Sequence, residues 1–118
     1  FFGTTASPAY EALEILDAEG HAIDTCRLRA FPFTRDVEEF IESHDTVFVI
    51  EQNRDAQMRR LLLNESDVAT REKLVSVLNY DGLPITARHI AAQIRGRLDG
   101  SNVTQMPRKR EGIRRVSA

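Results

Sequence analysis

The segment Val47–Leu62, VFVIEQNRDAQMRRLL, decides the fold class of this chain. It begins with an uninterrupted apolar run, which is typical of a strand covered on both faces of a parallel sheet. A polar turn follows from Glu51 to Asp55, and the residues after it place apolar side chains at helical spacing. A strand, a polar turn and a helix in this order form the edge at which open α/β sheets meet ligands or partner chains.

The same alternation of strand and helix patterns extends on both sides of this segment. Strands are predicted at residues 22–28, 46–50 and 74–78, after a strand remnant at residues 1–2. Helices are predicted to begin near Ser7, Thr34, Ala56 and Thr86, the first ending at Gly20 and the last at Gly100. Strands that alternate with helices are typical of a three-layer α/β/α fold with a mainly parallel sheet and right-handed crossovers.

The size and composition of the chain fit one globular domain. It has 118 residues, of which 42% are hydrophobic and 29% charged. Residues 1–100 are predicted to form this domain. Residues 101–118 lack apolar periodicity and carry a net charge of +4, so they are predicted to form a basic, flexible tail. The tail has no aromatic side chain on which bases could stack, so a solvated tail is favoured over nucleic-acid binding.

The apolar runs and the single cysteine indicate the cellular compartment of the protein. No apolar run approaches the roughly 20 residues that a membrane-spanning helix needs. Cys26 suits a reducing compartment, and its apolar surroundings in the sequence favour a small buried hydrophobe over a nucleophile. We therefore expect a cytoplasmic protein without membrane contact. The chain opens abruptly on Phe1-Phe2-Gly3, so we expect a fragment or a domain of a longer polypeptide.

Polar side chains follow the central predicted strand. They are Glu51, Gln52, Asn53 and Arg54. Glu51 ends an apolar strand, so partial desolvation could make it a proton carrier. The alternative, which is favoured, is that Arg54 or Arg59 pairs with Glu51 while Asn53 or Asp55 caps the next helix. These residues are candidates for an interface or a ligand-binding edge.

A second candidate group follows the last predicted strand. Tyr80 and Asp81 could donate to and accept from a ligand there. The favoured alternative is that Asp81 and Gly82 form a turn and that Tyr80 covers the end of the sheet. The histidines, interpreted as surface or packing residues, are His21, His44 and His89. No catalytic, cofactor-binding or metal-binding residue is predicted in this chain.

Three phrases of the sequence together resemble one family. They are RLRAFPF at residues 27–33, VFVIEQNRDAQ at residues 47–57 and YDGLPITAR at residues 80–88. They are similar to the alpha subunit of 2-oxoacid:ferredoxin oxidoreductases, most of all to the 2-oxoglutarate type (2-oxoglutarate synthase). The resemblance runs from Phe2 to about Leu98 and falls in the domain that looks like the transketolase C-terminal domain.

The resemblance implies membership of a larger enzyme. The family oxidatively decarboxylates a 2-oxoacid with coenzyme A, and electrons pass from thiamine diphosphate through iron–sulfur clusters to ferredoxin. In the family, thiamine diphosphate is held by another domain of the alpha subunit and by the beta subunit. No phrase of this chain matches those segments. The resemblance therefore implies a non-catalytic assembly domain, inactive alone, that packs against the beta subunit and other domains of the oxidoreductase.

The resemblance also implies a sheet in which the first strand is largely truncated. The strand that ends at Gly3 would lie centrally, yet only Phe1 and Phe2 remain of it. Its neighbours, 22–28 and 46–50, would then expose unpaired edges, so we expect the chain to form an oligomer. An alternative function is a free-standing flavodoxin-like binding or signalling module. A module of this kind would require a complete first strand with a phosphate-binding or acidic cluster at its end.

Overall fold

The computed structural model describes residues 1–100 and 114–118. The helices are the short 3₁₀ helix η1 (Gly3–Thr5), α1 (Ala6–Ala18), α2 (Arg35–Glu42), α3 (Gln57–Asn64), α4 (Val68–Arg71) and α5 (Ala87–Gly100). The strands are β1 (Thr25–Arg27), β2 (Val47–Glu51), β3 (Leu74–Leu78) and β4 (Arg115–Ser117). Most predicted elements therefore form where the periodicity of the sequence placed them.

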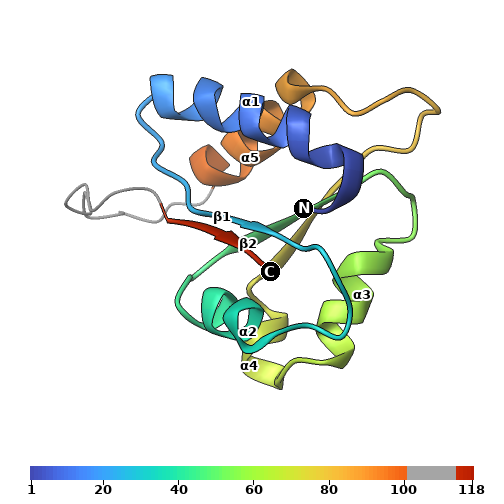
Figure 1. Ribbon diagram of the computed structural model, residues 1–118. Coiled ribbons are helices and arrows are strands. Elements are labelled where there is room, and N and C mark those ends of the chain that lie inside the picture. The colour runs from blue at the N-terminus through green and yellow to red at the C-terminus, as the bar shows by residue number, and fades with distance from the viewer. Residues whose placement is uncertain (101–113) are drawn as a thin grey trace.

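All strand pairs in the described residues are parallel. β2 pairs with β3 over five residues, from Val47 opposite Leu74 to Glu51 opposite Leu78. β1 pairs with β4, and Phe2 forms a single parallel bridge with Leu28 on the other side of β1. Helices α1 and α5 cover one face of the strands, and α2, α3 and α4 lie on the other (Figure 1). The predicted α/β fold with parallel strands is thus confirmed.

The core explains why the central strand is apolar throughout. Ile50 points into a buried cluster with Leu16 of α1 and Ile90 of α5. The neighbouring Val49 points the opposite way, into a cluster with Ile41 of α2 and Leu62 of α3. Successive side chains of a strand face opposite sides of the sheet, so burying both sides requires a continuous apolar run.

Glycines at positive φ mark both ends of the first helical segment. Gly3 has φ +56° where the chain turns from the strand remnant into η1. Gly20 has φ +91° directly after α1, and the N–H of His21 donates to the carbonyl of Leu16 at 2.9 Å. Glycine adopts these conformations without steric cost, so the predicted end of the helix at Gly20 is confirmed. The start is earlier than predicted, since Ser7 lies inside α1 rather than at its N-cap.

The structure differs from the predicted tail at its very end. Residues 115–117 form β4, whereas the sequence predicted a flexible tail over 101–118. A three-residue strand has too few positions to show a period, so its partner rather than its own pattern defines it. Residues 101–113, the rest of the predicted tail, lie outside the described residues. Among those that are described, no helix combines the length and apolar character needed to cross a membrane.

Candidate functional site

Glu51 ends β2 and is completely buried. Its Oε1 accepts hydrogen bonds from the backbone N–H of Met58, at 2.6 Å, and from the side-chain amide of Asn53, at 3.0 Å. Its Oε2 accepts from the backbone N–H of Arg59 at 3.1 Å. The carboxylate therefore satisfies two N–H groups at the start of α3, where the helix dipole also favours a negative charge. Its oxygens are engaged in holding the helix onto the strand.

This arrangement corrects the predicted ion pair of Glu51 with an arginine. The Arg54 guanidinium lies 3.2 Å from Asp55 on the surface. The Arg59 side chain donates instead to the carbonyl of Leu74 at 2.9 Å. Backbone N–H groups of an approaching helix satisfy a buried carboxylate without burying a second charge, which would itself have to be desolvated.

Asn53 completes the start of α3. Its Oδ1 accepts from the backbone N–H of Gln57 at 3.2 Å, while its amide donates to Glu51. Three consecutive N–H groups of the helix thus bond to two side chains, and of the two predicted caps Asn53 is the one that forms. Ala56, just before the helix, has φ +50° in the left-handed region. The capping by Glu51 was not predictable from sequence, because it lies seven residues before Met58 and no local capping rule covers that spacing.

Gln52 joins two segments that are far apart in the sequence. Its side-chain nitrogen donates to the hydroxyl of Thr5 at 3.1 Å, and its oxygen accepts from the backbone N–H of Ile85 at 3.1 Å. These bonds hold the start of α1 beside the loop that leads into α5. An open groove of about 660 Å³ lies between them, and its polar lining comprises Thr4, Ser7, Glu11, Gln52, Thr86 and Arg88.

The loop after β3 forms the predicted turn. Asp81 Oδ1 accepts from the backbone N–H of Leu83 at 2.9 Å, and Gly82 has φ +86°. The prediction that Tyr80 covers the end of the sheet is wrong, because this side chain is 64% exposed. The nearby Leu83 is 69% exposed. Together with Gln52 these two side chains line a second open hollow of about 440 Å³. The loop therefore presents apolar surface to the outside.

The structure brings the two predicted groups to one edge of the sheet. The backbone N–H of Asn79, after β3, donates to the carbonyl of Glu51 at 3.0 Å, so the ends of β2 and β3 are adjacent. Most of the polar side chains at this edge bond to the protein's own backbone. Arg54 is apart from them, paired with Asp55. Within residues 1–100 and 114–118, no three His, Cys, Asp or Glu side chains are grouped as metal ligands would be.

Cys26 has the environment of a packing residue. It is partly buried beside the cluster that contains Leu28 and Val49. Burial raises the pKa of its thiol, which disfavours the nucleophilic thiolate at neutral pH. This agrees with the interpretation from sequence that Cys26 is a small hydrophobe.

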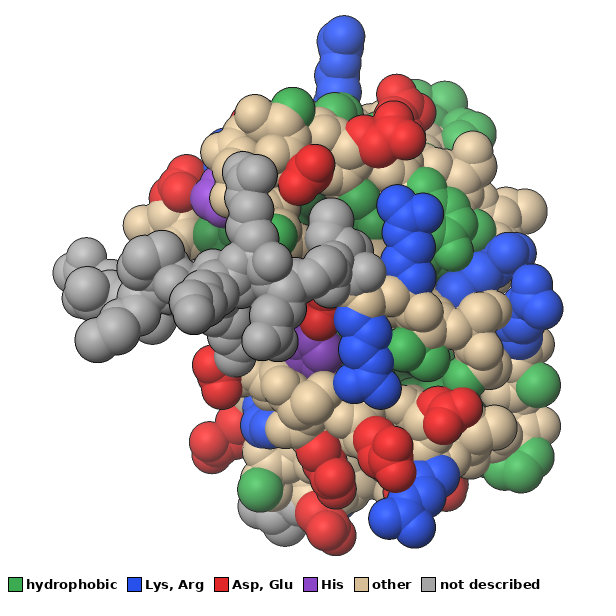
Figure 2. Space-filling view, turned by 60° about the vertical axis from the view of Figure 1, so that its left-hand side comes forward, with side chains coloured by type: hydrophobic (Ala, Val, Ile, Leu, Met, Phe, Trp, Pro, Cys, Tyr) green, Lys and Arg blue, Asp and Glu red, His purple; other side chains and the backbone are tan. Residues whose placement is uncertain are grey.

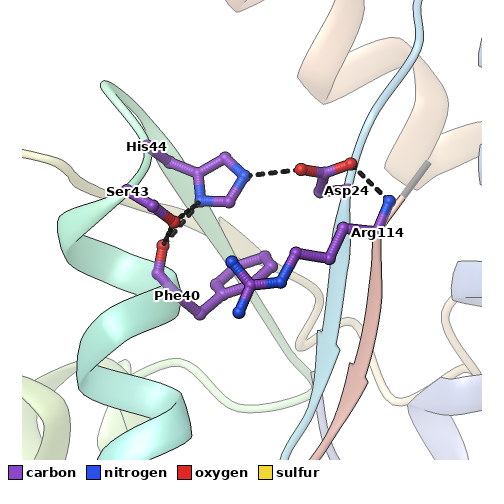
Figure 3. A network of polar contacts seen from close by, with 5 residues as sticks. All are labelled: Asp24, Phe40, Ser43, His44 and Arg114. Atoms are coloured by element: carbon purple, nitrogen blue, oxygen red, sulfur yellow. Dashed lines mark hydrogen bonds and ion pairs between the residues drawn. The ribbon is translucent and has the colours of Figure 1, made fainter. Parts of the chain in front are cut away.

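A polar cluster that the sequence did not indicate lies at the opposite ends of the strands. His44, just after α2, contacts the carboxylate of Asp24 at 2.9 Å, and Asp24 also accepts from the backbone N–H of Arg114 at 2.7 Å (Figure 3). Burial alone would raise the pKa of Asp24, but the hydrogen bonds from Arg114 and His44 outweigh it and hold this pKa below its usual value. The three residues come from distant segments, so no sequence spacing could have grouped them.

The molecular surface carries both signs of charge. On the face drawn in Figure 2, acidic and basic side chains both occur, with hydrophobic side chains between them. Arg95, on α5, pairs with Glu19 after α1, with Nε to Oε2 at 2.8 Å.

Comparison with known proteins gives one informative similarity. No family model matches the chain, and no solved structure matches it. The alpha subunit of 2-oxoacid:ferredoxin oxidoreductase 2 from Aeropyrum pernix is 31% identical over 96 residues, which is 80% of this chain. The chain is similar to part of that subunit. It spans 14% of the relative's length, and the similarity agrees with the resemblance to alpha subunits of 2-oxoacid:ferredoxin oxidoreductases in general.

Proposed function

We propose that this chain is an assembly domain of a 2-oxoacid:ferredoxin oxidoreductase alpha subunit, of the 2-oxoglutarate type and located in the cytoplasm. The observation that carries the proposal is the similarity over 96 residues to one segment of such a subunit. The site geometry supports a structural role, because the polar side-chain atoms of Glu51, Gln52 and Asn53 form hydrogen bonds within the chain. The exposed Tyr80 and Leu83 provide the kind of apolar surface that packs against another domain.

The proposal assigns the cofactors of the whole oxidoreductase to other parts of the complex. An iron–sulfur cluster needs a set of cysteines, and the chain has Cys26 alone. The described residues also hold no cluster of carboxylates and histidines for the metal ion that would accompany a diphosphate. In this proposal thiamine diphosphate, the iron–sulfur clusters, coenzyme A and ferredoxin are therefore bound by other segments and subunits of the complex. The partners of this chain are those segments and the beta subunit.

An activity assay tests the non-catalytic role. The isolated chain is supplied with 2-oxoglutarate, coenzyme A, thiamine diphosphate and an artificial electron acceptor, and acceptor reduction is followed against a heat-inactivated sample. We expect no turnover above that blank. Turnover by the purified chain would overturn the assignment of a non-catalytic domain.

An association assay tests the assembly role. The chain is co-expressed with the remaining alpha-subunit segments and the beta subunit of the same source, and the yield of complex is measured by affinity purification. We expect the double variant Tyr80→Ser, Leu83→Ser to lose most of the complex while keeping its own melting temperature. Glu42→Ser is the control, since Glu42 is exposed at the end of α2. Equal recovery of the double variant and the control would exclude the loop as the contact.

A further inference from the structure

Each ring nitrogen of His44 lies next to a hydrogen-bond acceptor. Its Nδ1 lies 2.6 Å from the carbonyl oxygen of Phe40, and its Nε2 lies 2.9 Å from Oδ2 of Asp24 (Figure 3). A carbonyl oxygen and an ionised carboxylate oxygen can only accept hydrogen bonds. Both contacts can be hydrogen bonds at the same time only if each ring nitrogen carries a hydrogen, and only the imidazolium cation has two. The Ser43 hydroxyl, 3.2 Å from Nδ1, itself donates to the Phe40 carbonyl and does not alter this requirement.

The charged pair is connected to the last strand of the chain. Asp24 Oδ1 accepts from the backbone N–H of Arg114, immediately before β4, at 2.7 Å. The backbone N–H of Thr25 donates in return to the carbonyl of Arg114 at 2.8 Å. Arg114 is thus held by both its N–H and its carbonyl, and the first of these bonds depends on the ionised Asp24. The segment after α2, the segment before β1 and the start of β4 meet at this point.

We propose that His44 and Asp24 form a pH-sensitive latch that holds the C-terminal strand β4 against β1. The latch is closed when His44 is the imidazolium and Asp24 is the carboxylate. Loss of the His44 proton would set an Nε2 lone pair against the carboxylate. Protonation of Asp24 would remove the charge that accepts from both His44 and Arg114. The latch lies before the first residues of β1, β2 and β4, whereas the function proposed above concerns the residues after β2 and β3.

Other charged and apolar groups surround the pair of His44 and Asp24. The Arg114 guanidinium also acts favourably on the Asp24 carboxylate and stays charged throughout. On α2, Asp36 acts on the thiol of Cys26, whose raised pKa keeps it neutral near pH 7. Asp45 follows His44 directly and has an interaction of its own. The Phe40 ring lies 4.4 Å from the His44 ring, centroid to centroid, and covers it with apolar surface.

The pH window of the latch has two limits. Because its pKa is held low in the folded state, Asp24 contributes stability above the usual carboxylate pKa, and this is lost as the pH falls through the lowered value. At the other limit, a neutral His44 ring has one N–H group, so either the Phe40 carbonyl or the Asp24 carboxylate would lose its donor. Between these limits β4 is held most firmly.

Opening the latch would uncover the outer edge of β1. At that edge the carbonyl of Arg27 accepts from Ala118 N–H at 3.0 Å, and Arg29 N–H donates to the Ala118 carbonyl at 2.6 Å. Exposed backbone groups of an edge strand pair readily with other strands. The ability of the β1 edge to pair with another strand would thus depend on pH.

Nuclear magnetic resonance tests the protonation state directly. In the full chain labelled with ¹⁵N, both ring nitrogens of His44 should show the imidazolium signature at about pH 6, and its loss with rising pH should coincide with faster hydrogen exchange of the Ala118 amide. After correction for intrinsic exchange, we expect protection of that amide to fall by about tenfold or more between pH 6 and 8.5. A neutral His44 ring at pH 6 would overturn the proposal without any variant.

Matched variants test whether His44 causes the change. His44→Gln keeps a side-chain donor that does not titrate, so the protection of the Ala118 amide should become flat over this pH range. His21→Gln is the control, since His21 lies after α1 and should leave the pH dependence unchanged. A pH dependence that persists in His44→Gln, or one that vanishes equally in His21→Gln, would show that His44 is not the titrating member of a latch.

Discussion

At the scale of single residues, the sequence marks Glu51 as a candidate proton carrier, but in the structure its carboxylate caps a helix. Its place after an apolar strand predicted a desolvated acid, and it is indeed fully buried. Its oxygens, however, accept from two backbone N–H groups of α3 and from the amide of Asn53. A buried charge is tolerated when hydrogen bonds of this kind replace its hydration.

Glu51→Gln should therefore be destabilising. A glutamine offers one acceptor oxygen, so its amide would face a backbone N–H of Met58 or Arg59, donor against donor. We expect a loss of about 1–3 kcal/mol in the free energy of unfolding, measured by urea titration. Asp55→Asn, at the exposed neighbour of Arg54, is the control and should change little. Equal stability of the two variants would show that the bonds of Glu51 contribute nothing.

At the scale of elements, β2 depends on burial of both faces. Val49 is 3% exposed and packs between helices and strands on one face, while Ile50 packs on the other. We expect Val49→Asp to prevent folding, because an unpaired buried charge costs several kcal/mol, comparable to the whole stability of a small domain. Circular dichroism and thermal melts measure this. A soluble Val49→Asp protein with a cooperative transition would contradict the structure of β2.

The strand β4 leads to the opposite expectation from the sequence. Deleting a flexible tail, which the sequence predicted over residues 101–118, would leave thermal stability almost unchanged. Removing residues 114–118 instead takes away the backbone partners of Thr25 and Arg29. We now expect the melting temperature to fall by about 5 °C or more, on the order of 1 kcal/mol for a domain of this size.

Ser117→Ala is the control for this truncation, because it keeps β4 and alters only an exposed side chain. It should melt with the unmodified chain. If the truncated chain also melted at that temperature, β4 would make no net contribution to stability.

At the scale of the whole molecule, the strands form two separate sheets. In the described part of the chain, no backbone hydrogen bond joins β1 or residues 1–2 to β2. Phe1 lies beside β1, where its ammonium donates to the carbonyl of Cys26 at 3.3 Å and its carbonyl accepts from Leu28. Burial lowers the pKa of this ammonium, which means that a charge at this place is unfavourable. A peptide N–H in its place would remove that charge.

We therefore expect an N-terminal extension of about six to eight residues, one strand length, to raise the melting temperature and the solubility. Such a segment would continue alongside β1 in the parallel register set by Phe2 and Leu28. The present chain should self-associate through its open strand edges. Light scattering and thermal melts on both forms measure this. A monomeric present chain as stable as the extended one would contradict it.

The sequence by itself determined the α/β class, the parallel strands and the turns at Gly20 and Asp81. These features follow from the hydrophobic periodicity and from turn-forming residues, both of which act within a few residues. A short stretch of sequence is therefore enough to predict them. Tertiary structure alone decided the burial of the Glu51 carboxylate under α3, the bridge from Gln52 to Thr5 and the docking of β4. The last of these joins Asp24 to Arg114 across 90 positions. Hydrogen bonds between such distant groups depend on where the packed helices and strands bring them, and no spacing along the chain encodes that position.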